Sequence, residues 1–252
     1  MSARREDARV AASTAAGVRG ERTSAGREEA LGTLAASIHG CHRCPRLVAW
    51  REQVAREKRA AFRTESYWGR PIAGFGDPDA RVLLLGLAPA AHGANRTGRI
   101  FTGDRSGDFL FAALHRTGYA SQPTSRHRGD GLALRDCWIT AAVRCAPPAN
   151  KPLPSERENC AGWLRTELAL LARARVVVCL GAFAWDAGLR RLAPGLRPRP
   201  RFGHATEAHG GGLTLLGCYH PSQQNTFTGR LTPAMLDAVL ERAGELARLS
   251  VL

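Results

Sequence analysis

Four short apolar runs recur along the chain, separated by longer stretches of mixed polarity. They are R-V-L-L-L-G at 81–86, C-W-I-T-A-A-V at 137–143, R-V-V-V-C-L-G at 175–181 and L-T-L-L-G-C-Y at 213–219. Continuous apolar runs of this length are typical of strands that are buried on both faces. The intervals between the runs leave room for crossover helices. The pattern predicts an α/β fold with three layers, α/β/α, around a central, mostly parallel four-stranded sheet.

Helical spacing of apolar residues marks three further segments. The first helix is predicted from about residue 27 to residue 39. The second is predicted to open with a capping box formed by Ser155 and Glu158 and to run to about Leu171. The third is predicted to begin at Thr232 and to continue close to the end of the chain. These helices supply the layers that cover the predicted sheet.

Composition favours one globular domain without a membrane segment. The chain has 252 residues, of which 44% are hydrophobic. Residues 1–26 show no apolar periodicity and are predicted to be a disordered tail, so residues 27–252 form the expected domain. The chain contains no apolar run of membrane-spanning length and lacks an N-terminal secretory signal, so we expect a cytoplasmic protein.

The net charge of +14 is the strongest compositional signal. All but two of the 36 basic residues are arginine, and residues 1–30 carry nearly as many acids as bases, so the excess belongs to the predicted domain. A field of this size favours a polyanionic partner, either DNA or RNA. Two basic segments, 46–70 and 190–201, are candidates for holding phosphates on either side of a binding site, the alternative being plain solvated loops.

The seven cysteines separate into two sets. One set lies in or beside the apolar runs and is interpreted as small buried hydrophobic residues, namely Cys137, Cys179 and Cys218. The other set forms C-x2-C and, after a gap of 100 residues, C-x14-C, namely Cys41, Cys44, Cys145 and Cys160. Four thiolates from two distant segments can hold one metal centre. The spacing leaves an iron–sulfur centre, zinc and unligated thiols open, and the wide second pair favours the iron–sulfur centre over two tight zinc knuckles.

Three motifs directly follow predicted strand ends. They are G-L-A-P-A from Gly86, R-C-A-P-P from Arg144 and H-P-S-Q-Q-N from His220. Ligands of parallel sheets bind beyond the carboxyl ends of the strands. The three motifs therefore predict one shared site, in which His220 is the candidate side chain for chemistry and a purely structural histidine is the alternative.

This ordered set of motifs resembles the iron–sulfur uracil-DNA glycosylases of the type B branch, also called family 5. The resemblance rests on the four spaced cysteines, the loop at 86–108 and H-P-S-Q-Q-N at 220–225, and it extends over roughly residues 30–250. It implies a uracil-DNA glycosylase-like fold and a monofunctional glycosylase that hydrolyses the N-glycosidic bond of uracil, and of other deaminated or damaged bases, in base-excision repair. It also implies a structural 4Fe–4S cluster on the four cysteines. The implied partners are double-stranded and single-stranded DNA, bound by a monomer at the nucleoid, with no membrane.

The resemblance assigns roles to individual residues. His220 would donate a hydrogen bond to the departing base, and Phe101 would stack on it. The implied base-binding set is Gly86, Ala88, Phe101 and Ala141. The implied DNA-binding set, which would enter the minor groove and fill the gap left by the flipped base, is Ser222, Gln223, Gln224 and Asn225.

Two departures from related glycosylases affect the expected chemistry. The loop that starts at Gly86 has no acidic or amide side chain among its first residues, so another group must position the attacking water. Asn95 and Asp104 are the polar candidates, and the sequence does not choose between them. Ala141 stands where relatives often carry an asparagine, and loss of a bidentate amide relaxes discrimination. We therefore expect a broader base range, with hypoxanthine and etheno-cytosine as further substrates.

Two other classes of function stay open at this point. One is a non-catalytic iron–sulfur protein that binds nucleic acid through its basic loops. The other is an iron–sulfur redox protein. The H-P-S motif at a strand end argues against the first, and the scarcity of further cofactor loops argues against the second. Release of free base from lesion-bearing DNA would distinguish a glycosylase from both.

Overall fold

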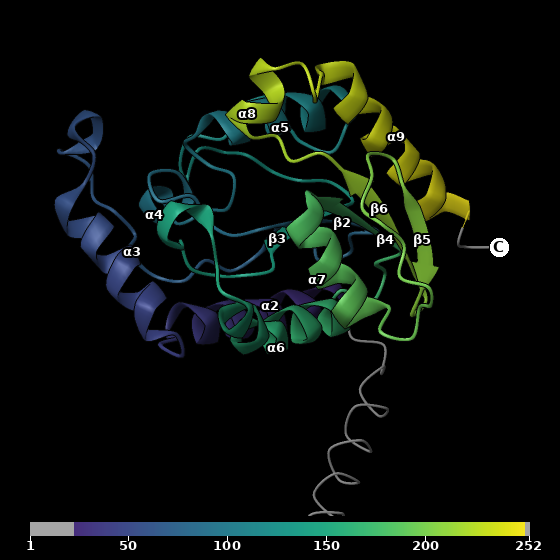
Figure 1. Cartoon of the computed structure of the whole chain (residues 1–252), viewed down its shortest axis with the longest axis horizontal. Coiled ribbons are helices and arrows are strands. Elements are labelled where there is room, and N and C mark those ends of the chain that lie inside the picture. The colour runs from purple at the N-terminus through teal and green to yellow at the C-terminus, as the bar shows by residue number, and fades with distance from the viewer. Residues whose placement is uncertain (1–22, 250–252) are drawn as a thin grey trace, which may run out of the picture.

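A computed structural model describes residues 23–249 and shows a mixed six-stranded sheet between two layers of helices (Figure 1). The strand order is β1-β3-β2-β4-β6-β5. The four central strands are parallel, and they are β2 (Val82–Gly86), β3 (Cys137–Ala141), β4 (Val176–Leu180) and β6 (Leu213–Cys218). They coincide with the four apolar runs, so the predicted α/β/α fold with a parallel core is confirmed.

Two short edge strands were not predicted. Strand β1 (Phe75–Gly76) pairs antiparallel with β3, and β5 (Glu207–Gly210) pairs antiparallel with β6. The sequence E-A-H-G of β5 carries two polar side chains because an edge strand is covered on one side only. Neither segment has the apolar run that revealed the central strands.

The helices divide between the two faces of the sheet. Helices α2 (Ser24–His39), α6 (Pro154–Leu170) and α7 (Ala182–Leu192) cover one face, and α5 (Arg105–Arg116) and α9 (Pro233–Leu249) cover the other (Figure 1). Alternate side chains of β2 serve the two faces, with Leu83 and Leu85 packing under the first layer and Val82 and Leu84 under the second. None of the helices in residues 23–249 is long and apolar enough to cross a membrane.

Five further helical segments lie in the described chain. They are α3 (Pro45–Glu57), η1 (Ala60–Phe62), α4 (Ala94–Thr97), η2 (Pro148–Asn150) and α8 (Gln223–Phe227). Helix α3 extends outward from the sheet at one end of the molecule (Figure 1).

The predicted boundary of the N-terminal tail was too late. Helix α2 begins at Ser24, and the Thr23 hydroxyl caps it by accepting a hydrogen bond from Gly26 N at 3.2 Å. Residues 23–26 therefore belong to the folded part. A threonine at the N-cap accepts a hydrogen bond from a backbone N–H of the first helical turn, which would otherwise have no partner. The remainder of the predicted tail, residues 1–22, lies outside the described residues.

The cap of α6 also differs from the prediction. The helix begins at Pro154, and the carboxylate of Glu156 accepts a hydrogen bond from Leu153 N at 2.7 Å. The predicted box between Ser155 and Glu158 was therefore wrong by two residues, and Glu158 instead pairs with Arg191 of α7. Proline at the first helical position fixes the start earlier than the serine suggested.

A buried ion pair joins the end of β3 to α6. Arg144 Nη2 lies 2.6 Å from Glu167 Oε2, and both side chains are only 2% exposed. The Thr140 hydroxyl donates to the same carboxylate oxygen at 2.6 Å. Removing one partner of such a pair leaves an uncompensated buried charge and typically costs about 3–5 kcal/mol. The pair thus fixes the chain immediately before Cys145.

Candidate active site and cysteine group

The carboxyl ends of the four parallel strands meet at one edge of the sheet. Gly86 at the end of β2 lies in register with Ala141 at the end of β3. Gly181, which follows β4, donates its N–H to Cys218 O at 2.8 Å, at the end of β6. We call the group formed here by Gly86, Phe101, Ala141, Gly181 and His220 the strand-end site.

Two glycines let aromatic rings lie directly against the strand ends. A Cβ on Gly86 would stand 2.9 Å from Cε2 of Phe101, and a Cβ on Gly181 would stand 3.3 Å from Cβ of His220. The centroids of the Phe101 and His220 rings are 5.8 Å apart, with 37° between their planes. The structure thus brings together Gly86, Phe101 and His220, which come from three separate segments of the chain.

The backbone at Phe101 adopts an unusual conformation. Its φ is +52°, in the left-handed region that bulky residues rarely enter. The Phe101 carbonyl lies against Gly107, where any side chain would collide with it. Backbone strain of this kind persists only when the surroundings hold it, and it concentrates at functional sites. Phe101 is therefore a candidate for function on conformational grounds as well.

His220 is neutral in this environment at pH 7. Burial lowers the pKa of its imidazole to about 4. Its position is fixed from behind, because the Asn225 amide donates to His220 O at 2.9 Å. A neutral imidazole can donate a hydrogen bond without losing a proton to its partner. The strand-end site therefore contains a positioned neutral donor.

The two candidates for positioning water differ in accessibility. Asn95 has no exposed surface, and its amide donates to Arg51 O at 3.1 Å, so it links α4 to α3. Asp104 caps α5 through a 2.9 Å bond from Gly107 N, while its Oδ2 lies against Gly93 in the loop after β2. Burial raises the pKa of Asp104, against the opposing hydrogen bonds from the first turn of α5. Asp104 is thus the candidate that retains exposed surface.

The four residues predicted to enter DNA divide into two groups. Gln223 and Gln224 are exposed on α8, and Ser222 stands at its N-cap. The Asn225 amide donates to the carbonyl of His220 and thereby holds the loop together.

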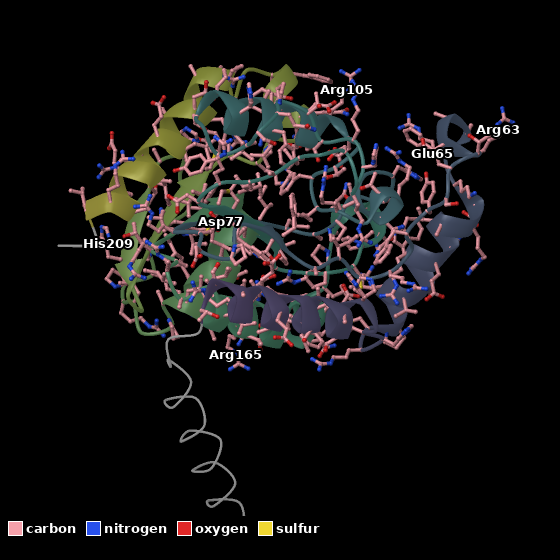
Figure 2. The ribbon with its side chains drawn as sticks, turned by 180° about the vertical axis from the view of Figure 1, so that it is seen from behind. Arg63, Glu65, Asp77, Arg105, Arg165 and His209 are labelled. Carbon is pink, nitrogen blue, oxygen red and sulfur yellow. The ribbon has the colours of Figure 1, made fainter. Side chains whose placement is uncertain are left out.

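The sequence analysis did not include Phe227 among the candidate site residues. Its side chain is 69% exposed, which is unusual for a large hydrophobic residue. It lies one helical turn after Gln223, on the same face of α8, and that i+4 spacing was the signal available in the sequence. The Arg105 guanidinium lies 5.7 Å from the Phe227 ring centroid, and Figure 2 shows Arg105 projecting from the surface.

The basic segment 190–201 begins at the far end of α7 and returns to the start of that helix, where Trp185 Nε1 donates to Pro200 O at 3.0 Å and Arg199 pairs with Asp186. Helix α7 starts at the carboxyl end of β4, so its last residues lie at the opposite edge, where Leu192 and Ala193 pack against Gly210 and Gly211. Its arginines are also largely engaged within the chain. Arg190 pairs with Asp186, Arg191 with Glu158, and Arg197 donates to backbone carbonyls.

Segment 46–70 is also partly neutralised. Arg46 forms a two-armed contact with Glu156 at 2.7 Å for both nitrogens, and Arg51 is 1% exposed. The prediction of two phosphate-holding flanks therefore missed the intramolecular partners of these arginines, which composition cannot reveal.

The cysteines of the two spaced pairs lie in one region, next to the strand-end loops. Cys44, Cys145 and Cys160 pack with Leu47 and Val143, and Ala88 of the loop after β2 contacts the same group. Cys41 lies nearby, because Arg51 Nη1 donates both to Cys41 O at 3.2 Å and to Cys145 Sγ at 3.0 Å. We call these four residues the cysteine group. Across residues 23–249, no three His, Cys, Asp or Glu side chains form a set that could hold a metal ion as they stand.

The chemistry around the cysteine group suits an anionic sulfur-rich centre. Two buried donors beside it, Arg51 Nε and Trp163 Nε1, have no hydrogen-bond partner within the described chain. Buried donors are rarely left unpaired, and an additional ligand is one explanation. The Arg51 guanidinium also supplies a buried positive charge next to Cys145. The residues present therefore fit a cluster of iron and sulfide held by four thiolates.

The other three cysteines are confirmed as core residues. Cys137, Cys179 and Cys218 have no exposed surface and lie within the central strands. Burial raises the pKa of the Cys218 thiol to about 12, so it stays protonated.

Two shallow surface depressions lie away from the strand-end site. One shallow depression lies between α2 and α6, lined by Leu34 and Leu170, and another lies at the sheet edge near His209 and Thr214. Neither contains a predicted site residue. The strand-end site is recognised from where the strands end and what stands there.

Comparisons with known proteins agree with the geometry. A sequence model of the uracil DNA glycosylase superfamily matches residues 73–244. The chain is 55% identical over 225 residues to the type-5 uracil-DNA glycosylase of Mycobacterium tuberculosis, covering 88% of this chain and 84% of that protein. It is 54% identical over 228 residues to the type-5 enzyme of Thermus thermophilus, covering 88% and 99%. A type-4 enzyme of Thermotoga maritima is 31% identical over 114 residues, covering 45% of this chain and 51% of that protein.

The depressed pKa of His220 predicts a pH-dependent loss of stability. The unfolded chain takes up a proton at this residue near pH 6.5, whereas the folded protein does so only near pH 4. The unfolded state therefore binds more protons as pH falls through this window, and folding stability is lost by about 2 kcal/mol between pH 7.5 and pH 5. Urea unfolding at both pH values should show that His220→Gln removes this increment. His209→Gln, at an exposed histidine (Figure 2), should leave it unchanged. An unaltered increment in His220→Gln would show that the ring is not held neutral.

Proposed function

The chain belongs to the uracil DNA glycosylase superfamily and, within it, to the type-5 uracil-DNA glycosylases, and we propose that the strand-end site is where it hydrolyses the N-glycosidic bond of uracil in DNA. The observation that carries the assignment is the juxtaposition of Phe101 and His220, 5.8 Å apart and each packed on a strand-end glycine. An aromatic face beside a fixed neutral donor is what recognition of a flat, hydrogen-bonding base requires. The enzyme is thus a DNA glycosylase of DNA repair.

Catalysis is proposed to act mainly on the departing base. A base in a duplex must leave the stack before its glycosidic bond can be reached. As that bond breaks, negative charge grows on the leaving uracil and positive charge on the sugar. His220 would donate a hydrogen bond to the growing negative charge, and its neutral state makes it a donor that does not transfer its proton. One such preorganised donor contributes about 3 kcal/mol, by analogy with oxyanion holes.

Asp104 is the proposed residue for orienting the attacking water. Its carboxylate stands at the N-terminus of α5 and reaches toward Gly93 in the loop after β2. A carboxylate near the sugar would also favour the developing positive charge. Asn95 is proposed to act indirectly, since its buried amide ties α4 to Arg51 O.

DNA contact is proposed for α8 and its N-terminal loop. Gln223 and Gln224 are exposed beside His220 and would occupy the gap left by the flipped base. Ser222 would contact the adjoining backbone, and Asn225 would hold the loop in shape. A site assembled on one side of a single chain suits both double-stranded and single-stranded DNA. It needs no second subunit, in keeping with a monomer that works at the nucleoid.

A broad base range is proposed from the apolar character of the strand ends. Ala141 is 2% exposed and lies in register with Gly86, so both strand ends present no polar side chain to a bound base. Selection would then depend on shape, stacking and backbone donors. Hypoxanthine and etheno-cytosine are the proposed further substrates.

The cysteine group is proposed to hold a 4Fe–4S cluster with a structural role. Cys41 and Cys44 lie between α2 and α3, Cys145 follows β3, and Cys160 lies in α6. The support is the set of four soft ligands around one buried region, the guanidinium of Arg51 and the unpaired donors beside it. A cluster here would join three segments of the chain. It would also stiffen the loop after β2, because Ala88 packs on the same group.

Removal of the proposed donor should separate catalysis from binding. We expect His220→Ala to lower the single-turnover rate of uracil release by about two orders of magnitude, the usual loss for one preorganised donor. Duplex affinity should change much less, because the phosphate contacts remain. His209→Ala serves as the matched control, since that side chain is exposed on the edge strand β5. A full rate in His220→Ala with every lesion would assign the histidine a purely structural role.

Restoring an amide at position 141 should narrow the base range. The wild type should release uracil, hypoxanthine and etheno-cytosine placed opposite guanine. Ala141→Asn should sharpen the preference for uracil, because a purine would leave the new amide poorly paired at a cost of about 1–3 kcal/mol. Ala141→Val, which adds bulk without hydrogen bonding, is the control for crowding. A wild type that cuts uracil alone would refute the relaxed-site idea.

Iron analysis should test the cluster directly. We expect about four irons and four sulfides per chain in the anaerobically purified protein. Cys145→Ser should lose the iron and unfold at a lower temperature. Cys218→Ser, which alters a buried thiol outside the cysteine group, should keep the iron. Stoichiometric zinc without iron or sulfide would contradict the proposal.

A further inference from the structure

Residues 119–135 form a hairpin-like excursion between α5 and β3. Its two arms meet at an isolated bridge between Ala120 and Leu134, and Ser121 N donates to Ala133 O at 2.9 Å. This base lies near the amino end of β3, which begins at Cys137. The far end of the excursion reaches the opposite edge of the sheet, where Gly103 N donates to Ser125 O at 3.0 Å. It therefore arrives two residues from Phe101.

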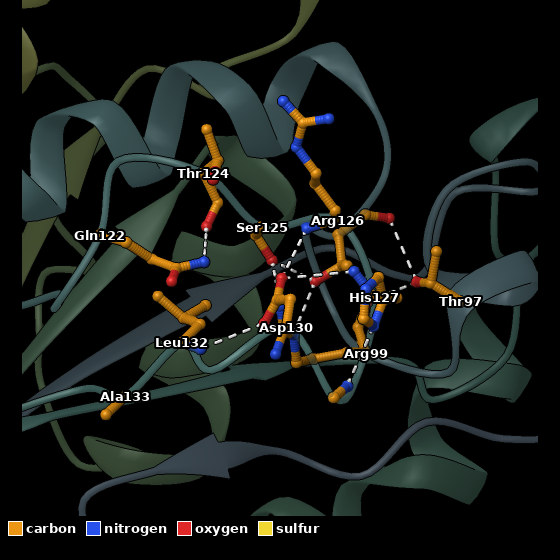
Figure 3. A network of polar contacts seen from close by, with 12 residues as sticks. Thr97, Arg99, Gln122, Thr124, Ser125, Arg126, His127, Asp130, Leu132 and Ala133 are labelled. Carbon is orange, nitrogen blue, oxygen red and sulfur yellow. Dashed lines mark hydrogen bonds and ion pairs between the residues drawn. The ribbon is translucent and has the colours of Figure 1, made fainter.

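A buried polar network fastens the excursion to the turn that carries Phe101 (Figure 3). Arg99 Nη2 donates to Ser125 Oγ at 2.8 Å and to Asp130 Oδ2 at 2.7 Å. Arg99 Nε donates to Thr102 Oγ1 at 3.0 Å, and the hydroxyls of Thr102 and Ser125 are 2.6 Å apart. Each of the four side chains is less than a tenth exposed. We call Arg99, Thr102, Ser125 and Asp130 the brace.

The brace acts on both sides of the strained residue. Arg99 precedes Phe101 by two positions and Thr102 follows it directly, so the left-handed turn is held from both flanks. Within the described chain, the side-chain hydrogen bonds of Arg99 and Thr102 that leave the turn go to Ser125 and Asp130. The Arg99 guanidinium also lies 5.4 Å from the Phe75 ring centroid. Ser125 and Asp130 therefore help to hold the turn that carries Phe101.

Asp130 also shapes the tip of the excursion. Its carboxylate accepts hydrogen bonds from Arg126 N at 2.7 Å and from Leu132 N at 3.2 Å. Burial acts to raise the pKa of Asp130, but the Arg99 guanidinium and these N–H groups outweigh it and hold the pKa well below its usual range. Asp130 is the one acid in residues 121–135, and its charge is taken up internally by Arg99.

The tip consequently presents unopposed positive charge. Arg126, His127 and Arg128 are all exposed, and Figure 3 shows the Arg126 side chain directed away from the brace. Arg128 lies 4.5 Å from the Trp68 ring centroid and Arg70 lies 5.7 Å from the same centroid, which extends the cationic surface. No acidic side chain of residues 23–249 forms an ion pair with Arg126 or Arg128.

We propose that this tip, Arg126 to Arg128, binds backbone phosphates of the DNA strand, and that the brace ties this contact to the position of the stacking ring Phe101. The proposal rests on the proposed function of the strand-end site. Phosphate contacts set the register of a protein on DNA but carry no sequence information. A rigid link from such a contact to Phe101 would place the flipped base against the ring only when the backbone is seated. Arg126 and Arg128 are then binding residues, and the brace residues are positioning residues.

Salt dependence of binding tests the tip. Arg126→Ala should weaken binding of uracil-containing and undamaged duplexes by the same factor and reduce the slope of log affinity against log salt by about 1. The single-turnover rate of uracil release at saturating DNA should fall as well, because the brace places Phe101 only when the backbone is seated at the tip. Arg135→Ala is the matched control, because this exposed arginine belongs to the same excursion but lies at its base, beside the amino end of β3. An unchanged affinity and slope in Arg126→Ala would overturn the phosphate contact.

Rates at saturating DNA test the brace. Thr102→Val keeps the shape of the side chain but removes the hydroxyl that contacts Arg99 and Ser125, and it should lower the single-turnover rate about tenfold or more, with affinity little changed. Thr102→Ser retains the hydroxyl and should restore the rate. If Thr102→Val does not fold, Ser125→Ala removes the same contact from the other side. A lowered melting temperature with an unchanged rate would overturn the coupling.

Different results would contradict the proposed glycosylase function and the proposed phosphate contact of the tip. Loss of uracil release in His220→Ala together with unchanged salt behaviour in Arg126→Ala would keep the strand-end site and reject the tip. Absence of base release from the wild type would reject the proposed function, while the binding slopes would still report on the phosphate contact.

Discussion

The parallel pairing of β2 with β3 is the constraint on which the functional parts of the molecule depend. The pairing does not stop where the sheet ends, because Ala142 N donates to Gly86 O and Val143 N donates to Leu87 O, each at 3.0 Å. Two loops therefore leave the sheet side by side. One leads to Phe101 and Asp104, and the other leads within two residues to Cys145. A shift of register by one residue would turn every side chain on these strands to the wrong face, and it would separate the strand-end site from the cysteine group.

Glycine at the strand ends is the second requirement for forming the strand-end site. A ring can lie on the end of a strand only where the strand presents no Cβ, and Gly86 and Gly181 meet that condition beneath Phe101 and His220. The site is therefore defined as much by missing side chains as by those present. This explains why residues that are 15 to 134 positions apart need no long side chains to reach one another.

The central sheet was predictable because its signals are local, whereas Phe101 was assigned only through the resemblance to known glycosylases. Each buried parallel strand is a continuous apolar run, and each candidate motif begins where such a run stops. The edge strands β1 and β5 were not predicted. They are two and four residues long and are covered on one side only, so their sequences contain no continuous apolar run. The sequence also did not predict that Asn225 donates to His220 O or that Phe227 is exposed. Tertiary contacts determine how side chains are oriented on a five-residue helix such as α8.

Charge was the least reliable guide at residue level. The excess of arginine correctly favoured a nucleic-acid partner, but it could not tell which guanidiniums are free. Arg190 and Arg191 are paired within the chain, Arg51 and Arg144 are buried, and Arg126 extends into solvent. Whether an arginine is paired depends on acidic residues that are distant in sequence, such as Glu158 and Glu167. Composition therefore fixes the sign of the surface field and leaves its pattern to the fold.

The order of the four cysteines along the chain has a consequence for biosynthesis. The group cannot close until Cys160 has left the ribosome, since α6 supplies the last thiol. At that moment β4, β6 and α9 are still to be made, and with them Gly181 and His220. The four cysteines can therefore come together while two of the four parallel strands, β4 and β6, are still to be made. A nascent chain therefore presents all four cysteines before it presents Gly181 and His220, which complete the strand-end site.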